Sequence, residues 1–410
     1  MNNFDNNLKK YARLLIKSGI NIQEGQTLVI NAPIHGDYFV RILAQEAYKS
    51  GAKNVHVEYN DEKLSLIKYM NAPDEAFKEY PKWKADGYAD MAREDHAFLS
   101  LSSSDPDLFK DVDPQRIANA NKAYGEAMAV FRKHISNSVN SWCVAAMPSK
   151  EWSQKVFPDL SEEDAMNKLW DNIFKATRAN EEDPVKAWDK HLDNLNRKLD
   201  FLNNNRIKTL HYKAKGTDLQ VELPRDYIWM GGGEDNSKGV YFIANMPTEE
   251  VFTLPLKTGV NGYVTSTKPL SYGGNLIDDF TLTFKDGKVV DFTAKEGYET
   301  LKNLIETDEG SAYLGEVALV PHDSPVSNTD IIFFNTLFDE NASCHFALGS
   351  AYPTNLKGGA DMDQDELDAN GVNTSITHVD FMVGSKELDI EATMEDGSKI
   401  MIFEKGDWAF

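Results

Sequence analysis

The chain has 410 residues, 41% hydrophobic and 26% charged, which predicts a globular protein of two or three domains. Its 65 acidic and 43 basic residues give a formal net charge of −22. Such an acidic surface repels phosphate backbones and anionic lipids, so we expect neither nucleic acid nor a membrane as a partner.

The first half of the chain alternates strand and helix signals. Short apolar runs predict four strands, at 27–30, 55–59, 97–101 and 142–146. Helical patterns are expected between them, at 38–50, 64–70 and 119–134. Strands separated by helices predict a parallel sheet covered on both faces.

A long helix closes this half. Asp183 and Pro184 provide a cap and a proline at the first helical position. Apolar residues then recur at helical spacing from Val185 to Leu202, and three asparagines follow. We place a boundary there, which predicts an N-terminal α/β domain at 1–205 and a C-terminal domain at 206–410.

The second half has a different pattern. Asp286-Gly287 and Asp396-Gly397 each lie between alternating apolar runs, the strongest short-range hairpin signal. This half therefore predicts an α+β domain rich in antiparallel sheet, with a helix near 299–306. The acidic stretch 357–371 predicts an exposed loop whose carboxylates form a solvated face.

Two cysteines, Cys143 and Cys344, are too few for a disulfide framework or a cysteine-rich zinc site, and they fit a reducing compartment. No run approaches the roughly 18 apolar residues of a membrane span. The polar N-terminus contains no signal-peptide core. We therefore expect a cytoplasmic protein.

Several common catalytic motifs are excluded. The glycine run 231–233 precedes Glu234 and Asp235, which would repel a phosphate, so it predicts a turn. No Gly-x-Ser-x-Gly elbow of a serine hydrolase occurs. Cys344 adjoins His345, but a catalytic pair must be adjacent in space, so we expect Cys344 to be a small buried residue.

A metal site is better supported. Three of the nine histidines, His322, His345 and His378, fall near carboxylates in the C-terminal part of the chain. His378 and Asp380 would share one face of a strand and could bind one cation through mixed nitrogen and oxygen ligands. Glu316 interrupts an apolar run, where a carboxylate is costly unless it is paired or metal-bound.

Plainer interpretations of these residues stay open. His378 and Asp380 could form a surface pair, and Glu316 could point to solvent from an edge strand. His322 follows Pro321 and could belong to a turn, so it is left out of the predicted ligands. On physical grounds alone a metal site and these alternatives are about equally supported.

At these residues the sequence resembles the thermophilic-type metallo-aminopeptidases, the group of aminopeptidase T, aminopeptidase S and PepS. The likeness spans essentially the whole chain, including the N-terminal α/β half. Five segments carry it: 246–252, 315–320, 323–325, 338–349 and 377–382.

The resemblance implies two divalent metal ions per subunit in the C-terminal domain, with tolerance of zinc, cobalt or magnesium. It also implies a homodimer that encloses its active sites. Carried over by motif, Glu316 would bridge the ions and Tyr352 would be the active-site tyrosine. The remaining implied ligands are Glu250, Glu340, His345, His378 and Asp380.

The enzyme would then release N-terminal amino acids from peptides with a free N-terminus, through attack by a metal-activated water molecule. Another metal hydrolase, an amidohydrolase or phosphoesterase, is one alternative, but the ligand segments are poor in the Arg and Lys that a phosphate needs. A non-catalytic cation-binding protein is a second alternative. A calcium site would be nearly all oxygen, and His345 and His378 argue against that.

Overall fold

A computed structural model describes residues 3–103, 105–272 and 275–410. The chain divides into two compact units. Unit 1 comprises Met1–His191 and Gly233–Pro247, and unit 2 comprises Leu192–Gly232 and Thr248–Phe410. The boundary predicted at residue 205 lies at the end of a helix, whereas this division falls within that helix. The segment Gly233–Pro247 also belongs to unit 1, so each unit consists of two separate stretches of the chain.

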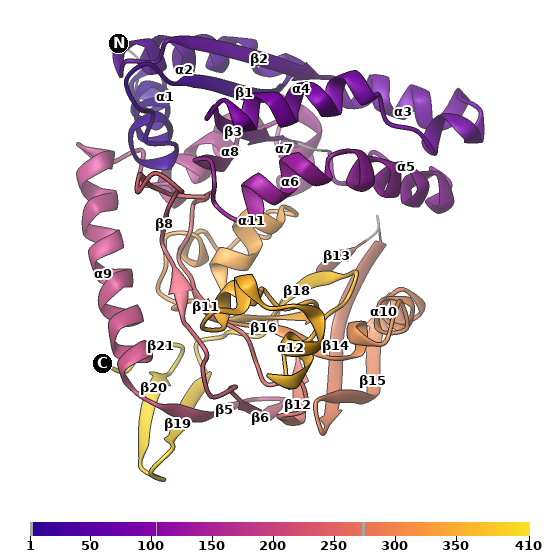
Figure 1. Ribbon diagram of the computed structural model, residues 1–410, viewed down its shortest axis with the longest axis vertical. Helices are drawn as coiled ribbons and strands as arrows, with labels where there is room; N and C mark the ends of the chain where they lie inside the picture. The colour runs from indigo at the N-terminus through magenta and orange to yellow at the C-terminus, as the bar shows by residue number, and fades with distance from the viewer. Residues whose placement is uncertain (1–2, 104, 273–274) are drawn as a thin grey trace. The chain divides into compact units, whose positions relative to one another are not determined.

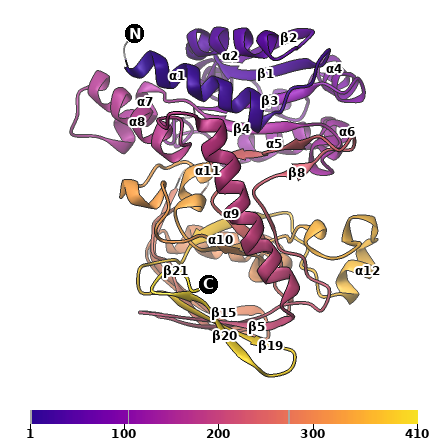
Figure 2. The same cartoon turned by 90° about the vertical axis from the view of Figure 1, so that its left-hand side faces the viewer.

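Unit 1 is built from helices and a parallel sheet (Figure 1). Its helices are α1 (Asn3–Leu14), α2 (Asp37–Lys49), α3 (Glu62–Asn71), α4 (Lys82–Arg93), α5 (Pro114–Ala127), α6 (Ala129–Ser136), α7 (Lys150–Val156) and α8 (Glu162–Ala176). Its strands are β1 (Thr27–Pro33), β2 (Asn54–Asn60), β3 (Ala97–Ser102), β4 (Trp142–Ala146), β8 (Glu234–Asp235), β9 (Tyr241–Phe242) and β10 (Asn245–Met246). Helix α9 (Pro184–Asn204) contains the division at His191 and Leu192, so its residues belong to both units (Figure 2).

The sheet of unit 1 has the order β10-β4-β3-β1-β2, and all its pairs are parallel. This confirms the parallel sheet expected from four apolar runs. Side chains of the strands pack against the helices that cover this sheet. Val29 and Phe98 pack against Tyr88 of α4, while Tyr11 of α1 stacks on Phe39 of α2 at 5.5 Å. The fifth strand, β10, comes from the returning segment and carried no local strand signal.

One helix of unit 1 differs from its prediction. The helix expected at 119–134 is two helices, α5 and α6, separated at Met128. Asp113 caps α5 by accepting a hydrogen bond from Gln115 N at 2.8 Å, so the helix begins earlier than its apolar pattern indicates. Met128 has a ψ of 7°, outside the helical range, and its side chain is buried. Burial of Met128 thus coincides with the break.

Unit 2 is rich in antiparallel strands. They are β5 (Ile207–Ala214), β6 (Thr217–Glu222), β7 (Met230–Gly231), β11 (Val251–Thr253), β12 (Val260–Thr265), β13 (Leu270–Tyr272), β14 (Asn275–Lys285), β15 (Lys288–Glu296), β16 (Leu314–Leu319), β17 (His345–Gly349), β18 (His378–Met382), β19 (Asp389–Met394), β20 (Lys399–Glu404) and β21 (Asp407–Trp408). Its short helices are α10 (Tyr298–Ile305), α11 (Thr336–Asp339) and α12 (Gln364–Ala369). The predicted α+β architecture is confirmed.

These strands form two antiparallel sheets. The larger runs β13-β14-β12-β6-β5-β19-β20-β21, with β15 paired to β14. The smaller runs β18-β17-β16-β11-β7. Both predicted hairpins occur, β14–β15 and β19–β20. At the first turn Gly287 has a φ of +83°, and a Cβ there would lie 1.8 Å from Lys257 O, so only glycine fits.

The acidic stretch 357–371 is not wholly a loop, because it contains α12. Asp363 caps this helix and forms a capping box with Glu366. Carboxylates at a helix start also favour the helix dipole, which a charge count alone did not indicate. Among the described residues, no helix is long and apolar enough to cross a membrane.

Candidate metal centre

One face of the smaller sheet carries the polar residues that were selected from the sequence. Register places Glu316 of β16 opposite Ala347 of β17, and Ala347 opposite Asp380 of β18. In the neighbouring row His345 lies opposite Ala318. The alternate residues point to the other face and join the core of unit 2; they include Val317, Leu319, Phe346, Leu348 and Phe381.

A first group of side chains consists of Glu250, Glu316 and His345, all buried, with ligand atoms within 4.8 Å of one another. His345 Nε2 lies 3.2 Å from Glu250 Oε2 and 3.6 Å from Glu316 Oε1. Glu250 directly precedes β11 and reaches the face from the strand beside β16. Residues separated by 95 positions in sequence therefore meet at one point.

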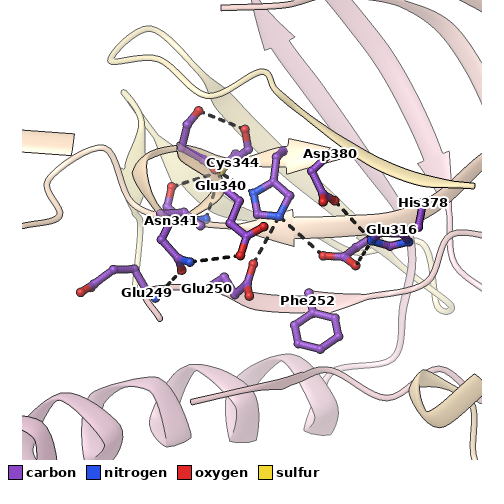
Figure 3. Close-up of polar contacts among 12 residues, drawn as sticks. Glu249, Glu250, Phe252, Glu316, Glu340, Asn341, Cys344, His378 and Asp380 are labelled. Carbon is purple, nitrogen blue, oxygen red and sulfur yellow. Dashed lines mark hydrogen bonds and ion pairs between the residues drawn. The ribbon is translucent and has the colours of Figure 1, made fainter. Parts of the chain in front are cut away.

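A second group shares Glu316 with the first and adds His378 and Asp380 (Figure 3). His378 Nε2 lies 3.4 Å from Glu316 Oε2 and 3.4 Å from Asp380 Oδ1. Glu316 thus turns one oxygen toward each imidazole. A carboxylate shared in this way has the arrangement needed to bridge two cations.

Backbone carbonyls orient both imidazoles. His345 Nδ1 donates a hydrogen bond to Ser343 O at 3.0 Å, and His378 Nδ1 donates to Ser350 O at 2.8 Å. These bonds place the proton on Nδ1 and direct Nε2 at the carboxylates. Metal-binding histidines characteristically use their second ring nitrogen in this way.

The charges of the centre shift one another's pKa values. Burial acts to raise the pKa of Glu316, but hydrogen bonds from His345 and His378 lower it to about 2. Burial raises the pKa of Glu250, and its single imidazole partner only partly opposes this effect. Burial acts to lower the pKa of His378, whereas Asp380 and Glu316 raise it to about 11. Glu316 is thus ionised between two imidazoles that attract protons or, equally, cations.

Glu340 lies next to these groups but belongs to neither of them. Burial, followed by the charges of Glu250 and Asp380, raises the pKa of Glu340 well above its ordinary value. Its neighbour Asn341 is fully buried and donates from Nδ2 to Leu337 O at 2.9 Å. Asn341 Oδ1 in turn accepts from the backbone N–H of Glu249 at 2.7 Å. Asn341 therefore ties the segment that carries Glu340 to the segment that carries Glu250.

Two aromatic residues border the centre. Phe252 follows Glu250 by two positions on the same side of β11, and Figure 3 shows its ring beside the carboxylates. The ring of Tyr352 lies 6.1 Å from that of Phe252 and 4.9 Å from that of His378. Desolvation, then the charges of Glu316 and Asp380, raise the pKa of Tyr352, so its hydroxyl keeps its proton at neutral pH. Tyr352 can thus donate a hydrogen bond near the imidazole of His378.

The donor set fits a divalent cation. Imidazole nitrogens with carboxylate oxygens suit zinc and cobalt, and carboxylates also suit magnesium. Within the described part of the chain, Asp380 Oδ1 is buried and receives no hydrogen bond, although it lies 3.4 Å from His378 Nε2. A buried carboxylate oxygen without a donor is costly, and a cation would satisfy it.

Outside the centre, the structure also places the histidine that was left out of the ligand set. The backbone N–H of His322 donates to Gly406 O at 2.8 Å, and His322 is absent from both groups. Cys344 is buried, as expected. Its thiol donates to Val320 O at 3.3 Å, and burial raises its pKa to about 12.

The residues that give the centre its space were not predicted from the sequence. Ala318 and Ala347 lie on the ligand-bearing face, between the side chains that converge. Larger residues there would occupy the volume that cations and substrate need. A signal was available, because each alanine lies two positions from a predicted ligand on the same strand.

Comparisons with known proteins find relatives over essentially the whole length of the chain. The family model of thermophilic metalloprotease (M29) matches residues 4–408. The chain is 53% identical to Aminopeptidase 2 of Geobacillus stearothermophilus, over 100% of this chain and 99% of that protein. It is 52% identical to Aminopeptidase AmpS of Bacillus subtilis, over the full length of both. The solved structure of wild-type AmpT from Thermus thermophilus superposes with a TM-score of 0.94 at 39% identity, covering 99% of this chain and 100% of that one.

Proposed function

Since the chain belongs to the thermophilic metalloprotease (M29) family, we propose that it is a metal-dependent aminopeptidase that releases N-terminal amino acids from peptides. The observation that carries the proposal is Glu316, a buried residue whose two oxygens face two different imidazoles. The two relatives named above are called aminopeptidases, and each aligns over the whole length of this chain.

Two divalent ions per subunit would be held by the two groups of side chains. Glu250 and His345 would bind one ion, and His378 and Asp380 the other, with Glu316 between them. The proximity of Glu340 supports it as a further ligand. Zinc, cobalt or magnesium would serve, since the donors are imidazoles and carboxylates.

When bound, the ions would acidify a water molecule and polarise the scissile carbonyl of the peptide. The protein's own part is to hold that arrangement. Glu316 would fix the spacing of the two groups and balance their charge. Tyr352 would donate a hydrogen bond from its protonated hydroxyl to the carbonyl oxygen as negative charge develops there. Tyr352 and Glu316 are thus the proposed catalytic residues.

The carboxylates also suit the substrate's other charged group. A peptide with a free N-terminus carries an ammonium or amine that carboxylates or a metal can bind. This preference for a free α-amino group would make the enzyme an exopeptidase. We further propose that it acts in the cytoplasm as a homodimer, in keeping with its two free, buried cysteines and with the family resemblance.

A phosphoesterase is the main alternative, because many of these enzymes also use two metals. Its substrate phosphate would need a cationic clamp. Among the residues that the structure describes, the ion pairs of this centre join imidazoles to carboxylates and include no Arg or Lys. The comparisons favour peptides as well, so the geometry and the family point to the same substrate class.

The test compares three substrates on one metal-loaded preparation: a peptide with a free N-terminus, the same peptide N-acetylated, and a phosphate monoester. We expect amino-acid release from the free peptide alone, and loss of that release after chelation. Equal cleavage of the acetylated peptide would contradict the exopeptidase assignment. Undiminished release by protein shown to contain no metal would contradict the metal centre.

A further inference from the structure

The segment that enters β18 carries two residues of the centre and has little apolar support. Residues 374–380 include His378 and Asp380, and none of the seven is buried. Ile376 is 83% exposed. Strand β18 is also the last strand of its sheet and pairs with β17 alone, whereas every residue of β17 is buried. Val379 packs against the core of unit 2, so hydrogen bonds must fix the residues that precede it, 374–378.

Asp308, in the turn between α10 and β16, supplies those hydrogen bonds. Its Oδ2 accepts from the backbone N–H of Ile376 at 2.7 Å, and its Oδ1 accepts from Ser375 Oγ at 2.8 Å. Oδ1 also accepts from the N–H and the hydroxyl of Ser311, both at 2.8 Å. Ser311 is completely buried, so one end of this network is anchored in the core.

The network continues to His378. Thr377 Oγ1 donates to Ser311 Oγ at 3.1 Å, and Thr377 N donates to Ser375 Oγ at 3.1 Å. Thr377 O then accepts from Ser350 N at 2.7 Å, and Ser350 O accepts from His378 Nδ1 at 2.8 Å. The direction of the His378 imidazole thus depends on the segment that Asp308 holds.

The charge of Asp308 suits this task. Desolvation acts to raise its pKa, but the donors of Ile376, Ser375 and Ser311 lower it to about 2. Asp308 is therefore ionised at neutral pH, and hydrogen bonds to an ionised acceptor are stronger than neutral ones.

We propose that Asp308 is a positioning residue of the candidate metal centre: by holding residues 375–377 it directs His378 Nε2 at Glu316 and Asp380. The inference rests on the proposed function, because it presupposes that these groups bind metal. It also predicts that the two metal sites respond differently, because loss of Asp308 should weaken metal binding by the group that contains His378. The group that contains Glu250 and His345 lies on other strands and should keep its affinity.

The test is Asp308→Asn, which keeps the side chain's size and removes its charge. A matched control is Asp396→Asn in the β19–β20 turn, where Asp396 accepts hydrogen bonds from Ser398 N and Oγ at 2.9 and 2.6 Å. Zinc is titrated into each metal-free protein. We expect one of the two sites of Asp308→Asn to weaken by about 10–100-fold, as for other groups that support metal ligands. Asp396→Asn should match the parent.

Two further readouts separate positioning from general stability. The absorption spectrum of the cobalt-loaded protein should change in Asp308→Asn and not in Asp396→Asn, because it reports ligand geometry. Excess metal should also restore most of the lost activity. In the metal-free protein, the amide protons of Ile376 and Thr377 should exchange faster in Asp308→Asn than in the parent.

The outcomes separate this inference from the proposed function. A parent protein that binds no divalent metal overturns both. A parent with two sites, together with an Asp308→Asn variant of equal affinities, overturns the positioning role alone. Equal weakening of metal binding in Asp396→Asn likewise overturns the positioning role. Should Asp308→Asn fail to fold, Ser375→Ala removes only one of the donors to Asp308. The same titration and exchange measurements on that variant then test the positioning role.

Discussion

Replacing Glu316 by glutamine removes the carboxylate that contacts both imidazoles while keeping the volume of the side chain. The lowering of its pKa from 4.5 to about 2 corresponds to a net preference for the ionised form on the order of 3 kcal/mol, which the attraction of His345 and His378 provides against the effect of burial. A neutral amide cannot provide that attraction, nor can it balance two divalent ions. Altered support of metal ligands typically costs about 10–100-fold, so loss of a bridging ligand should lower kcat by at least that factor.

The fold should survive this substitution. Val317 and Leu319 point to the opposite face and remain in the core, so β16 should still pack. An amide that stays partly unpaired in the buried centre would cost about 1–3 kcal/mol of unfolding free energy. The thermal midpoint should therefore fall by several degrees without loss of cooperativity.

The assay measures kcat, metal content and thermal midpoint on one preparation. Glu234→Gln is the matched control, because Glu234 is a half-buried carboxylate of unit 1 that accepts a hydrogen bond from Ser138. The control should keep both metals and a normal kcat. Near-normal kcat of Glu316→Gln with two metals bound would refute the bridging role. Gross unfolding would instead identify Glu316 as a structural residue.

Further predictions concern other parts of unit 2. Tyr352→Phe should retain both metals and lower kcat by about 10²–10³-fold, as for loss of one oxyanion donor; unchanged kcat would exclude the proposed hydrogen bond. Neutralising Asp361 and Asp365 should leave kcat unchanged, because they lie in the exposed segment around α12. A loss of kcat as large as that of Glu316→Gln would show that the metal centre has been assigned to the wrong residues. Metal binding should release about one proton from His378, whose pKa is raised to about 11; calorimetry in two buffers of different ionisation enthalpy measures it, and no release would contradict the protonated imidazole. The pKa of Asp308, about 2 against an ordinary 3.8, means that its stabilising contribution is present above about pH 4 and is lost as the pH falls toward 2. The difference in thermal midpoint between parent and Asp308→Asn should shrink over that range.

The amino-acid sequence by itself determined the features that depend on near neighbours in the chain. Four apolar runs predicted the strands β1 to β4, because each run is long enough to be buried in a sheet. Asp286-Gly287 predicted a hairpin, since glycine alone tolerates the backbone of that turn. His378 and Asp380 were paired correctly by strand alternation, which holds wherever a strand forms.

Only the tertiary structure decided which distant residues meet. The register of β16, β17 and β18 sets Glu316 between two imidazoles and leaves alanines beside it, and no local pattern specifies a register between strands. The return of β10 to the sheet of unit 1 was missed for a related reason. The capping box of Asp363 and Glu366, in contrast, is a local signature that the charge of the segment concealed. Asp308 shows the limit most clearly. Its function depends on Ile376, 68 positions away, because hydrogen bonds follow distance in space and not distance along the chain.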